Sequence, residues 1–342
     1  MRVNRLMKMH KYIAFILLVF IVGCKGKKKI PDVSGISVNI ATLRFEQAFF
    51  SIDTNHINEG VQKLYEKYPG FTQDFLFNIV GINPQSPDAE AQIKRFISTY
   101  YPIYTFSQQK FANLNTIDAE LKEGLQRVKY YFPNYTLPNK LITFIGPINS
   151  YGNIITRDGL ATGLQLYLGK DYPLYTSQEA QEMYPAYLSR RFEPNYIPIN
   201  CIKNIIDDIA PMQSGSKTLL ENIIEQGKRL YILDACLPNV ADSLKTGYTA
   251  KQLAACEDNE KALWTFFVQN NLLYSTDIAL TAPYTTDGPK TEALGDDAPG
   301  NIGLFTGWKI VQRWMSKQEK VSMDALLQKD AKTLFQEAKY KP

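Results

Sequence analysis

The feature that most restricts the fold is a short β-rich segment in the middle of a chain that otherwise shows helical spacing. Residues 140–145 read Lys-Leu-Ile-Thr-Phe-Ile and are closed by Gly146-Pro147. Further on, the apolar runs 154–156 and 160–167 flank Arg157-Asp158-Gly159. Because Asp-Gly between two apolar runs is a strong hairpin signal, the segment predicts a small antiparallel or mixed sheet of three or four strands. A mainly helical α+β fold is therefore expected.

Helical spacing is clear before the β-rich segment. Across residues 116–132 apolar side chains recur at steps of three and four, which marks one buried helical face. Pro87-Asp88 predicts the start of an earlier helix. The alternation of Ile36, Val38 and Ile40 predicts a strand that leads into a helix within residues 33–50. Helices are predicted over residues 57–68, 88–100 and 116–132.

The C-terminal half also shows mainly helical signals. Thr249 with Gln252 fits a capping box, and Ser322 is placed to cap a later helix. Gly303 and Gly307 lie four residues apart in an apolar helical pattern, which favours close packing against another helix over a ligand-binding loop. Residues 277–299 lack periodicity and predict a surface loop. Since the sequence has no internal repeat or long linker, one compact domain is expected over residues 33–342.

The first residues of the chain have the layout of a bacterial lipoprotein signal. A basic stretch precedes ten apolar residues, 13–22, which are too few to span a bilayer of about 30 Å as a helix. The run ends in Ile-Val-Gly-Cys, which resembles a lipobox whose cysteine, Cys24, is lipidated and becomes the first mature residue. We predict a signal peptide over residues 1–23, a lipidated basic tether over 24–32, and attachment to a membrane through Cys24 by acyl chains such as palmitate.

The charge balance argues against nucleic acid as a partner. The formal net charge is +4, but the predicted signal peptide holds four basic residues and no acid. Four more lysines follow Cys24 within the tether, so acidic residues outnumber basic ones in the rest of the chain. A composition of 45% hydrophobic and 21% charged residues is that of a globular protein. The basic tether, unlike an acidic surface-export signal, favours the periplasmic side.

Cysteine and histidine restrict the possible chemistry. His56 alone remains after the signal peptide, so a two-histidine zinc motif is excluded, and no metal or cofactor is expected. Its context, Asn-His-Ile-Asn-Glu, is that of an exposed helix start rather than a catalytic base. Cys201, Cys236 and Cys256 show no CxxC spacing; buried free thiols are favoured, and one disulfide among them remains an alternative.

Several stretches of the sequence resemble the gliding-motility lipoprotein B family of the Bacteroidota. They are Arg44-Phe45-Glu46-Gln47-Ala48-Phe49-Phe50, Leu168-Gly169-Lys170-Asp171-Tyr172-Pro173, Gly227-Lys228-Arg229-Leu230-Tyr231, Pro299-Gly300-Asn301-Ile302-Gly303 and the ending Ala338-Lys339-Tyr340-Lys341-Pro342. The resemblance covers nearly the whole chain. It implies a cell-envelope protein associated with gliding motility, with motility or secretion proteins as partners. It implies no biochemical activity.

A more distant resemblance connects residues 197–211, 219–233 and 303–315 to a group of predicted zinc metallopeptidases. In that group an HExxH helix, a helix bearing Glu-Gly and a glycine-rich helix follow one another. Here the first helix reads Cys-Ile-Lys-Asn-Ile-Ile-Asp-Asp over residues 201–208, so the histidines are missing. The resemblance implies a zincin-like scaffold without the metal site, with a vestigial cleft near Glu225 and Tyr231.

The sequence therefore favours a pseudo-enzyme that acts through protein binding. One alternative is an envelope peptidase or glycan hydrolase, and its carboxylates would come from Asp207, Asp208, Glu221 and Glu225. Another alternative is a glycan- or peptide-binding lipoprotein, because 21 Tyr and 18 Phe can line a groove. No catalytic residue is assigned on these grounds.

Overall fold

The computed structural model describes residues 30–213 and 215–342. The chain divides into two units, Met1–Asp32 and Val33–Pro342, and the fold below is that of the second unit. The predicted signal peptide and Cys24 lie outside the described residues. Within the described part, no helix is both long enough and apolar enough to cross a bilayer.

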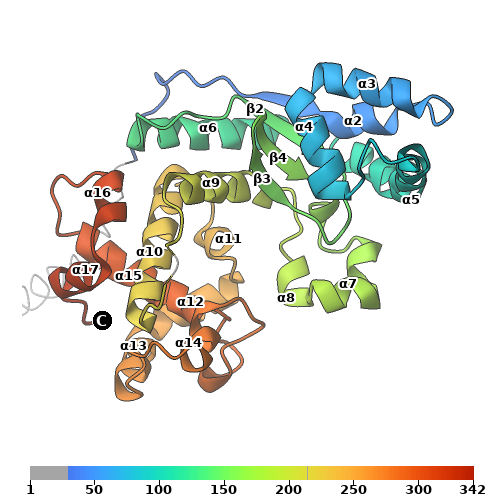
Figure 1. The fold of residues 1–342 in the computed structure, drawn as a ribbon. Helices are drawn as coiled ribbons and strands as arrows, with labels where there is room; N and C mark the ends of the chain where they lie inside the picture. The colour runs from blue at the N-terminus through green and yellow to red at the C-terminus, as the bar shows by residue number, and fades with distance from the viewer. Residues whose placement is uncertain (1–29, 214) are drawn as a thin grey trace, which may run out of the picture. The chain divides into compact units, whose positions relative to one another are not determined.

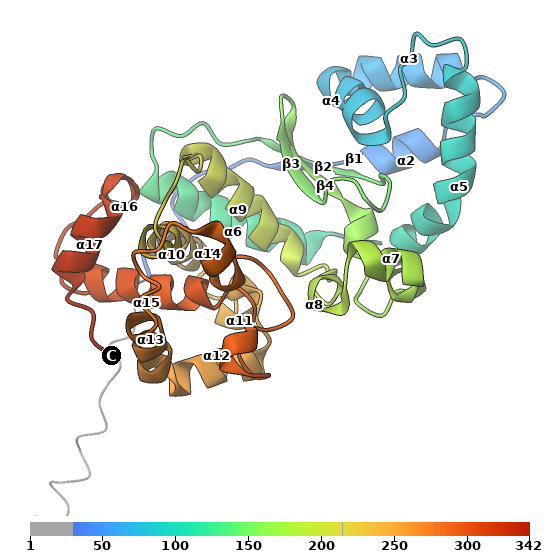
Figure 2. The same ribbon diagram turned by 60° about the horizontal axis from the view of Figure 1, so that its bottom comes forward.

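The sheet is small and mixed, as predicted. Its four strands run in the order β1-β2-β4-β3. The β1–β2 and β2–β4 pairs are parallel, and the β3–β4 hairpin is antiparallel, so β1 and β3 form the two edges (Figure 2). The strands are β1 (Ala41–Arg44), β2 (Lys140–Phe144), β3 (Asn153–Thr156) and β4 (Gly159–Gly163). The mainly helical α+β class is confirmed.

The helices of the first half pack an aromatic core against this sheet. The ring centroids of Phe45 and Phe75 lie 4.9 Å apart. The ring of Phe71 packs edge-on against that of Phe45, with 4.8 Å between the centroids. Phe144 of β2 joins them, so the core connects the sheet to the helices. These elements are α2 (Phe45–Phe50), α3 (Ile57–Lys67), α4 (Pro69–Asp74), the π-helix η1 (Phe75–Val80), α5 (Ala89–Lys110) and α6 (Asn115–Tyr131).

Two of the three predicted helices in this half are confirmed, and the other boundaries need correction. Helix α5 runs on to Lys110 through Pro102 instead of ending near residue 100. A strand that leads into a helix is found within residues 33–50, as predicted, but it is β1 and not the alternating residues 36–40, where Gln126 of α6 donates its side-chain amide to the Ile36 carbonyl. Strand pairing begins at Ala41, whose N–H donates to the Asn139 carbonyl.

The predicted hairpin is confirmed, but its second strand is shorter than expected. It ends at Gly163, and a 3-10 turn, η2 (Leu164–Leu166), follows. The buried Gln165 side chain accepts from Gly146 N–H and donates to the Tyr151 carbonyl, so it ties the turn to the chain beside β2. The next short helices are η3 (Pro173–Thr176), α7 (Gln178–Met183) and α8 (Ala186–Ser189).

Helix α10 (Leu219–Cys236) is the centre of the second half and packs against α6, α9 and α15 (Figure 1). Thr249 forms the predicted capping box at α12, and Ser322 caps α16. The loop prediction for residues 277–299 is wrong in part, because Asp277 caps the helix α14 there. The elements are α9 (Tyr196–Ile209), α11 (Asp242–Thr246), α12 (Ala250–Asp258), α13 (Glu260–Gln269), α14 (Ile278–Thr285), η4 (Glu292–Leu294), α15 (Ile302–Met315), α16 (Met323–Gln328) and α17 (Ala331–Ala338).

The glycines predicted to allow close packing lie where α15 meets α10. A Cβ added to Gly307 would lie 1.7 Å from the Ile223 carbonyl oxygen, and one added to Gly303 would lie 2.5 Å from Ile223 Cγ2. On the facing helix, a Cβ on Gly227 would lie 2.3 Å from the Gly307 carbonyl carbon. The two backbones therefore approach each other closely because neither side has a Cβ at the contact.

Candidate functional site

A hollow of about 420 Å³ lies beside the start of β3 and along helix α9, and we call it the α9 pocket. Asn200, Lys203, Asn204 and Asp207 line it from α9. Their spacing places them on one face of the helix. Figure 2 shows α9 lying close to the β3 edge of the sheet, and the two elements are in contact. The aromatic part of the lining consists of Tyr167, Tyr184, Phe192 and Tyr196.

A polar network fixes the wall between β3 and α9. The Asn153 amide donates to Thr162 Oγ1 at 2.9 Å and to Cys201 Sγ at 3.2 Å. The Tyr167 hydroxyl donates to the Asn153 side-chain oxygen and accepts from the Asn200 amide at 2.8 Å. Because each side chain is bonded to its neighbours, this wall is preorganised rather than formed by a ligand.

Two basic residues of the α9 pocket differ in their pairing. Arg191 binds Asp287 through two hydrogen bonds of 2.9 and 3.1 Å, so its charge is neutralised by a planar pair. Lys203 is partly buried and forms no hydrogen bond or ion pair within the described residues. Burial, assisted by the charge of nearby Arg191 and opposed by the charges of Asp287 and Asp207, lowers the pKa of Lys203 to about 8. An ammonium in this situation favours an incoming anion.

A second, smaller hollow of about 180 Å³ connects α9 to α10, and we call it the bridging pocket. It shares Lys203 and Asp207 with the α9 pocket, and α10 contributes Gln226 and Arg229. Arg229 donates to Asp207 Oδ1 at 3.2 Å and lies 3.5 Å from Glu225 Oε2. The guanidinium thus joins the two helices across the hollow.

The structure does not bring the two predicted cleft residues together. Glu225 lines a separate polar hollow of about 400 Å³ at the start of α10, the α10 pocket, and its carboxylate accepts from Lys228 Nζ at 2.6 Å. Tyr231 is not in that lining. It is partly buried against the core, and burial raises the pKa of its hydroxyl. The cleft seen along α9 is formed by other residues.

The four carboxylates of the enzymatic alternative are divided among different surroundings. Glu221 completes the capping box of α10 through Thr218, and Glu225 lies one turn further along the same pocket. Asp207 faces the α9 pocket, whereas Asp208 accepts from the Tyr135 hydroxyl at 2.7 Å. Each of the four carboxylates thus has a partner within the described residues, which for Asp207 is Arg229 and for Glu225 is Lys228.

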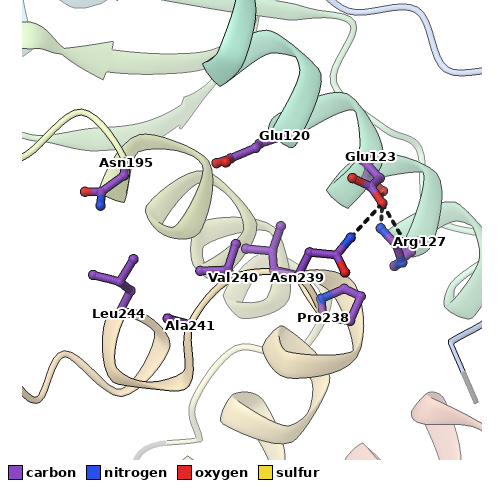
Figure 3. Close-up of a pocket in the computed structure, with 10 residues that line it drawn as sticks. Glu120, Glu123, Arg127, Asn195, Pro238, Asn239, Val240, Ala241 and Leu244 are labelled. Carbon is purple, nitrogen blue, oxygen red and sulfur yellow. Dashed lines mark hydrogen bonds and ion pairs between the residues drawn. The ribbon is translucent and has the colours of Figure 1, made fainter. Parts of the chain in front are cut away.

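Another hollow of about 230 Å³, the α6 pocket, lies between α6, the start of α9 and the loop into α11 (Figure 3). Glu123 accepts from Arg127 at 2.7 Å and from Asn239 at 3.3 Å. Burial and the charge of Glu123 raise the pKa of Glu120 on the same wall. Its loop side is mainly apolar, and its central charges are already paired. It is therefore a less suitable binding site than the α9 pocket.

Of the remaining candidates, only Cys201 belongs to one of these pockets, because its Sγ accepts from Asn153 in the wall of the α9 pocket. His56 is exposed and contacts Asp53 at 2.9 Å at the start of α3. Cys201, Cys236 and Cys256 are buried free thiols, in agreement with the favoured interpretation. Within the residues that the structure describes, no group of three His, Cys, Asp or Glu side chains could hold a metal ion.

Arg191, Asn153 and the role of Lys203 were not predicted from the sequence. One signal was available for Lys203, because it is the single cation on a helix whose neighbours Ile202, Ile205 and Ile206 are apolar and buried. A lone cation among buried residues is a functional candidate by physical argument. The contribution of Asn153 depends on the pairing of β3, which no local pattern indicates.

The fold and the site are those of a mainly helical α+β protein with a preformed polar pocket at the edge of its sheet. No curated protein and no solved structure matches the chain. Residues 26–342 match the family described as gliding motility protein GldB, so the chain belongs to that family of gliding-motility lipoproteins. The family recognised from sequence stretches is thereby confirmed.

Proposed function

We propose that this lipoprotein supports gliding motility or the associated secretion machinery by binding a protein in the α9 pocket. The observation that carries the proposal is the pocket itself, a hollow of about 420 Å³ with a fixed amide wall and aromatic sides. Its volume lies within the usual range for ligand sites, and an unpaired ammonium supplies specificity. The other two charged residues of the lining are already paired, Arg191 with Asp287 and Asp207 with Arg229, which supports binding rather than catalysis.

The proposed arrangement on the membrane follows from the layout of the chain. Residues 1–23 are removed, Cys24 carries the lipid, residues 24–32 form the tether, and 33–342 form one domain that faces the periplasm. Membership of a lipoprotein family supports the anchor, and the compact unit Val33–Pro342 supports the single domain. Each buried CH₂ contributes about 0.8 kcal/mol, so several acyl chains give durable attachment.

A metal-free, peptidase-like scaffold is part of the proposal. Lys203 and Asp207 have the spacing of the two histidines in HExxH, and Asn204 has the position of the glutamate. All three line the α9 pocket. In the bridging pocket, Gln226 lies beside Lys203 and Asp207. The Lys203 ammonium stands at the position of the first histidine and repels a cation. Arg229 binds the carboxylate of Asp207, which stands at the position of the second histidine. These donors fit an anionic or polar ligand and do not fit zinc.

The test is site-specific crosslinking in living cells of a gliding host. A photoreactive phenylalanine replaces Tyr184 in the pocket or, as a control, Ile278, which is 78% exposed on α14. Mass spectrometry should identify the same motility or secretion proteins with the Tyr184 probe, and few or none with the Ile278 probe. A Cys24→Ala chain should lose both the membrane fraction and these partners. Equal partner sets from the two positions would contradict binding in the pocket.

Two further measurements separate this proposal from the enzymatic alternative. Asp208→Asn and Glu225→Gln variants should retain motility, because both carboxylates lie outside the lining of the α9 pocket and neither is assigned a chemical step. Protein purified without added metal should contain no stoichiometric zinc by elemental analysis. Loss of motility with a folded Glu225→Gln protein, or one zinc per chain, would favour an enzyme.

A further inference from the structure

Strand β3 is an edge strand whose outer backbone groups have no partner within the described residues. The Gly163 N–H donates to the Gly152 carbonyl at 2.8 Å, and this pair is in register with the β3–β4 ladder. In an antiparallel ladder the bonded pairs alternate, so Ile154 and Thr156 direct their backbone groups to β4. Asn153 and Ile155 therefore direct their N–H and C=O groups outward.

This edge strand has neither a charged side chain nor a proline, two of the features that protect edge strands, although α9 and α4 pack beside it. Natural sheets block exposed edges with charged side chains, proline or a covering element. Strand β3 reads Asn-Ile-Ile-Thr, without a charge or a proline, and the Ile155 side chain is 38% exposed. Such a strand is a template for the backbone of another extended segment.

The open edge and the α9 pocket adjoin each other at Asn153. Asn153 belongs to the pocket lining, and its side chain is fixed by Thr162, Tyr167 and Cys201. A segment paired with β3 would therefore pass over a hollow whose sides are aromatic. In an extended segment alternate side chains point to the same face, so every second one would enter the pocket.

The charged residues of the α9 pocket indicate one property of the segment that would bind there. Of the charged residues that line the α9 pocket, Arg191 is paired with Asp287 and Asp207 with Arg229. Lys203 has no counter-ion within 4 Å in the described chain. The carboxylates of Asp207 and Asp287 act on Lys203 only from a greater distance, and both are paired with arginines, so a direct contact with a further carboxylate would stabilise the partly desolvated ammonium. A peptide supplies such a group through an Asp or Glu side chain or through its C-terminus.

We propose that β3 accepts an extended acidic polypeptide segment as a fifth strand, with a carboxylate of that segment bound to the Lys203 ammonium. The inference rests on the proposed function and specifies the chemistry of its partner. The strand supplies two N–H and two C=O groups from Asn153 and Ile155. The pocket supplies the aromatic contacts and the charge. Main-chain pairing gives affinity, and the pocket gives selectivity.

The test uses the full-length lipidated protein in detergent micelles and a pool of ten-residue peptides. The peptides are randomised over Thr, Val, Ser and Asp and are prepared with either a free or an amidated C-terminus. Retained peptides are identified, and their affinity is measured by fluorescence polarisation. We expect the retained peptides to have a carboxylate, either of Asp or of the C-terminus. Failure of every peptide, or retention of peptides without a carboxylate, would overturn the inference.

Two sets of changes test the geometry. Methylation of single peptide nitrogens should weaken binding at alternate positions by about tenfold or more, because only alternate N–H groups face β3. On the protein, Ile155→Pro removes an outward N–H that has no partner in the fold, and it should weaken binding by a similar factor. Ile155→Val is the matched control and should bind normally. Uniform tolerance of N-methylation would show that no strand is added.

The contact with the Lys203 ammonium is tested separately from the pairing with β3. Lys203→Met should weaken acidic peptides about tenfold and leave their Asn-substituted or amidated versions unchanged, whereas Lys203→Arg should retain most of the affinity. An equal loss for both kinds of peptide would contradict the carboxylate contact. If all peptides fail while the Tyr184 probe still crosslinks its partners in cells, strand addition is wrong and the proposed function stands. If both fail, the proposed function is wrong as well.

Discussion

Replacement of Gly307 by alanine should separate the two central helices of the second half. The added Cβ would lie 1.7 Å from the Ile223 carbonyl oxygen and 2.4 Å from its carbonyl carbon. A carbon–oxygen contact is comfortable at about 3.3 Å, so α15 must withdraw from α10 by about 1.5 Å. The obstructing atoms are backbone atoms of a helix, and no rotamer change can remove them.

The size of the effect follows from the contacts that such a shift weakens. A gap of about 0.5–1 Å already removes a quarter to a half of a van der Waals contact. Overpacking usually costs about 1–3 kcal/mol, and alanine returns up to about 1 kcal/mol through helix propensity. Since the clash is with a rigid backbone, we expect a net loss of about 3 kcal/mol, near the upper end of that range.

The assay is thermal unfolding followed by circular dichroism. A loss of about 3 kcal/mol in a domain of this size should lower Tm by about 6 °C. The control is Gly35→Ala, because nothing lies within 4 Å of a Cβ at that position. Its Tm should change by less than about 1 °C. A Gly307→Ala protein with the Tm of the unsubstituted chain would refute the close approach of the helices.

Three other predictions concern buried polar groups. Lys245 lies 2.5 Å from Asp234 with both side chains buried, so Lys245→Met should lower the free energy of unfolding by about 3–5 kcal/mol in urea titrations, and a second change, Asp234→Leu, should restore much of it. Burial raises the pKa of Glu46 above its ordinary value of 4.5, so above pH 4.5 the folded state binds more protons than the unfolded state. The free energy of unfolding should therefore fall as the pH rises from 4.5 through the pKa of the folded state. A Glu46→Gln protein should lack that fall. The three buried cysteines should react with a thiol reagent at pH 8 only after denaturation, and fast labelling of the native protein would contradict their burial.

The parts of the fold that are determined locally could be predicted from sequence. The hairpin was found because Asp158-Gly159 specifies a tight turn, and α6 because its buried residues recur once per turn. The contact at Gly307 was also anticipated, since small residues on an apolar helix face favour close packing. In each case a few neighbouring residues define the structure.

The errors occurred where distant residues decide the outcome. Residues 36–40 alternate like a strand but remain unpaired because Gln126 occupies the Ile36 carbonyl. Helix α5 continues through Pro102 because the residues beyond it still pack, although proline usually ends a helix. The cleft near Glu225 and Tyr231 was predicted from a resemblance and stays a prediction, whereas the α9 pocket, where β3 and a later segment converge, was not predicted.

Lys203 gives a last prediction that separates binding from stability. A lysine whose pKa is lowered to about 8 in the folded state and is near 10.4 when unfolded destabilises the fold while it is charged. The unfolded chain binds more protons between these values, so stability should rise as pH increases through about 8 to 10. Because Lys203 as a whole residue is only partly buried, solvent screens its charge, and the effect at neutral pH should be about 1–2 kcal/mol rather than the full shift.

Lys203→Met should therefore be more stable than the unsubstituted chain at pH 7, and the difference should shrink toward pH 9.5. Guanidinium titrations at the two pH values measure this difference, with Lys251→Met, an exposed lysine paired with Asp297, as the control. A less stable Lys203→Met protein would show that the ammonium has a structural partner. A more stable one would show that the chain keeps an unfavourable charge at the sheet edge, and such a residue is expected where function rather than folding requires it.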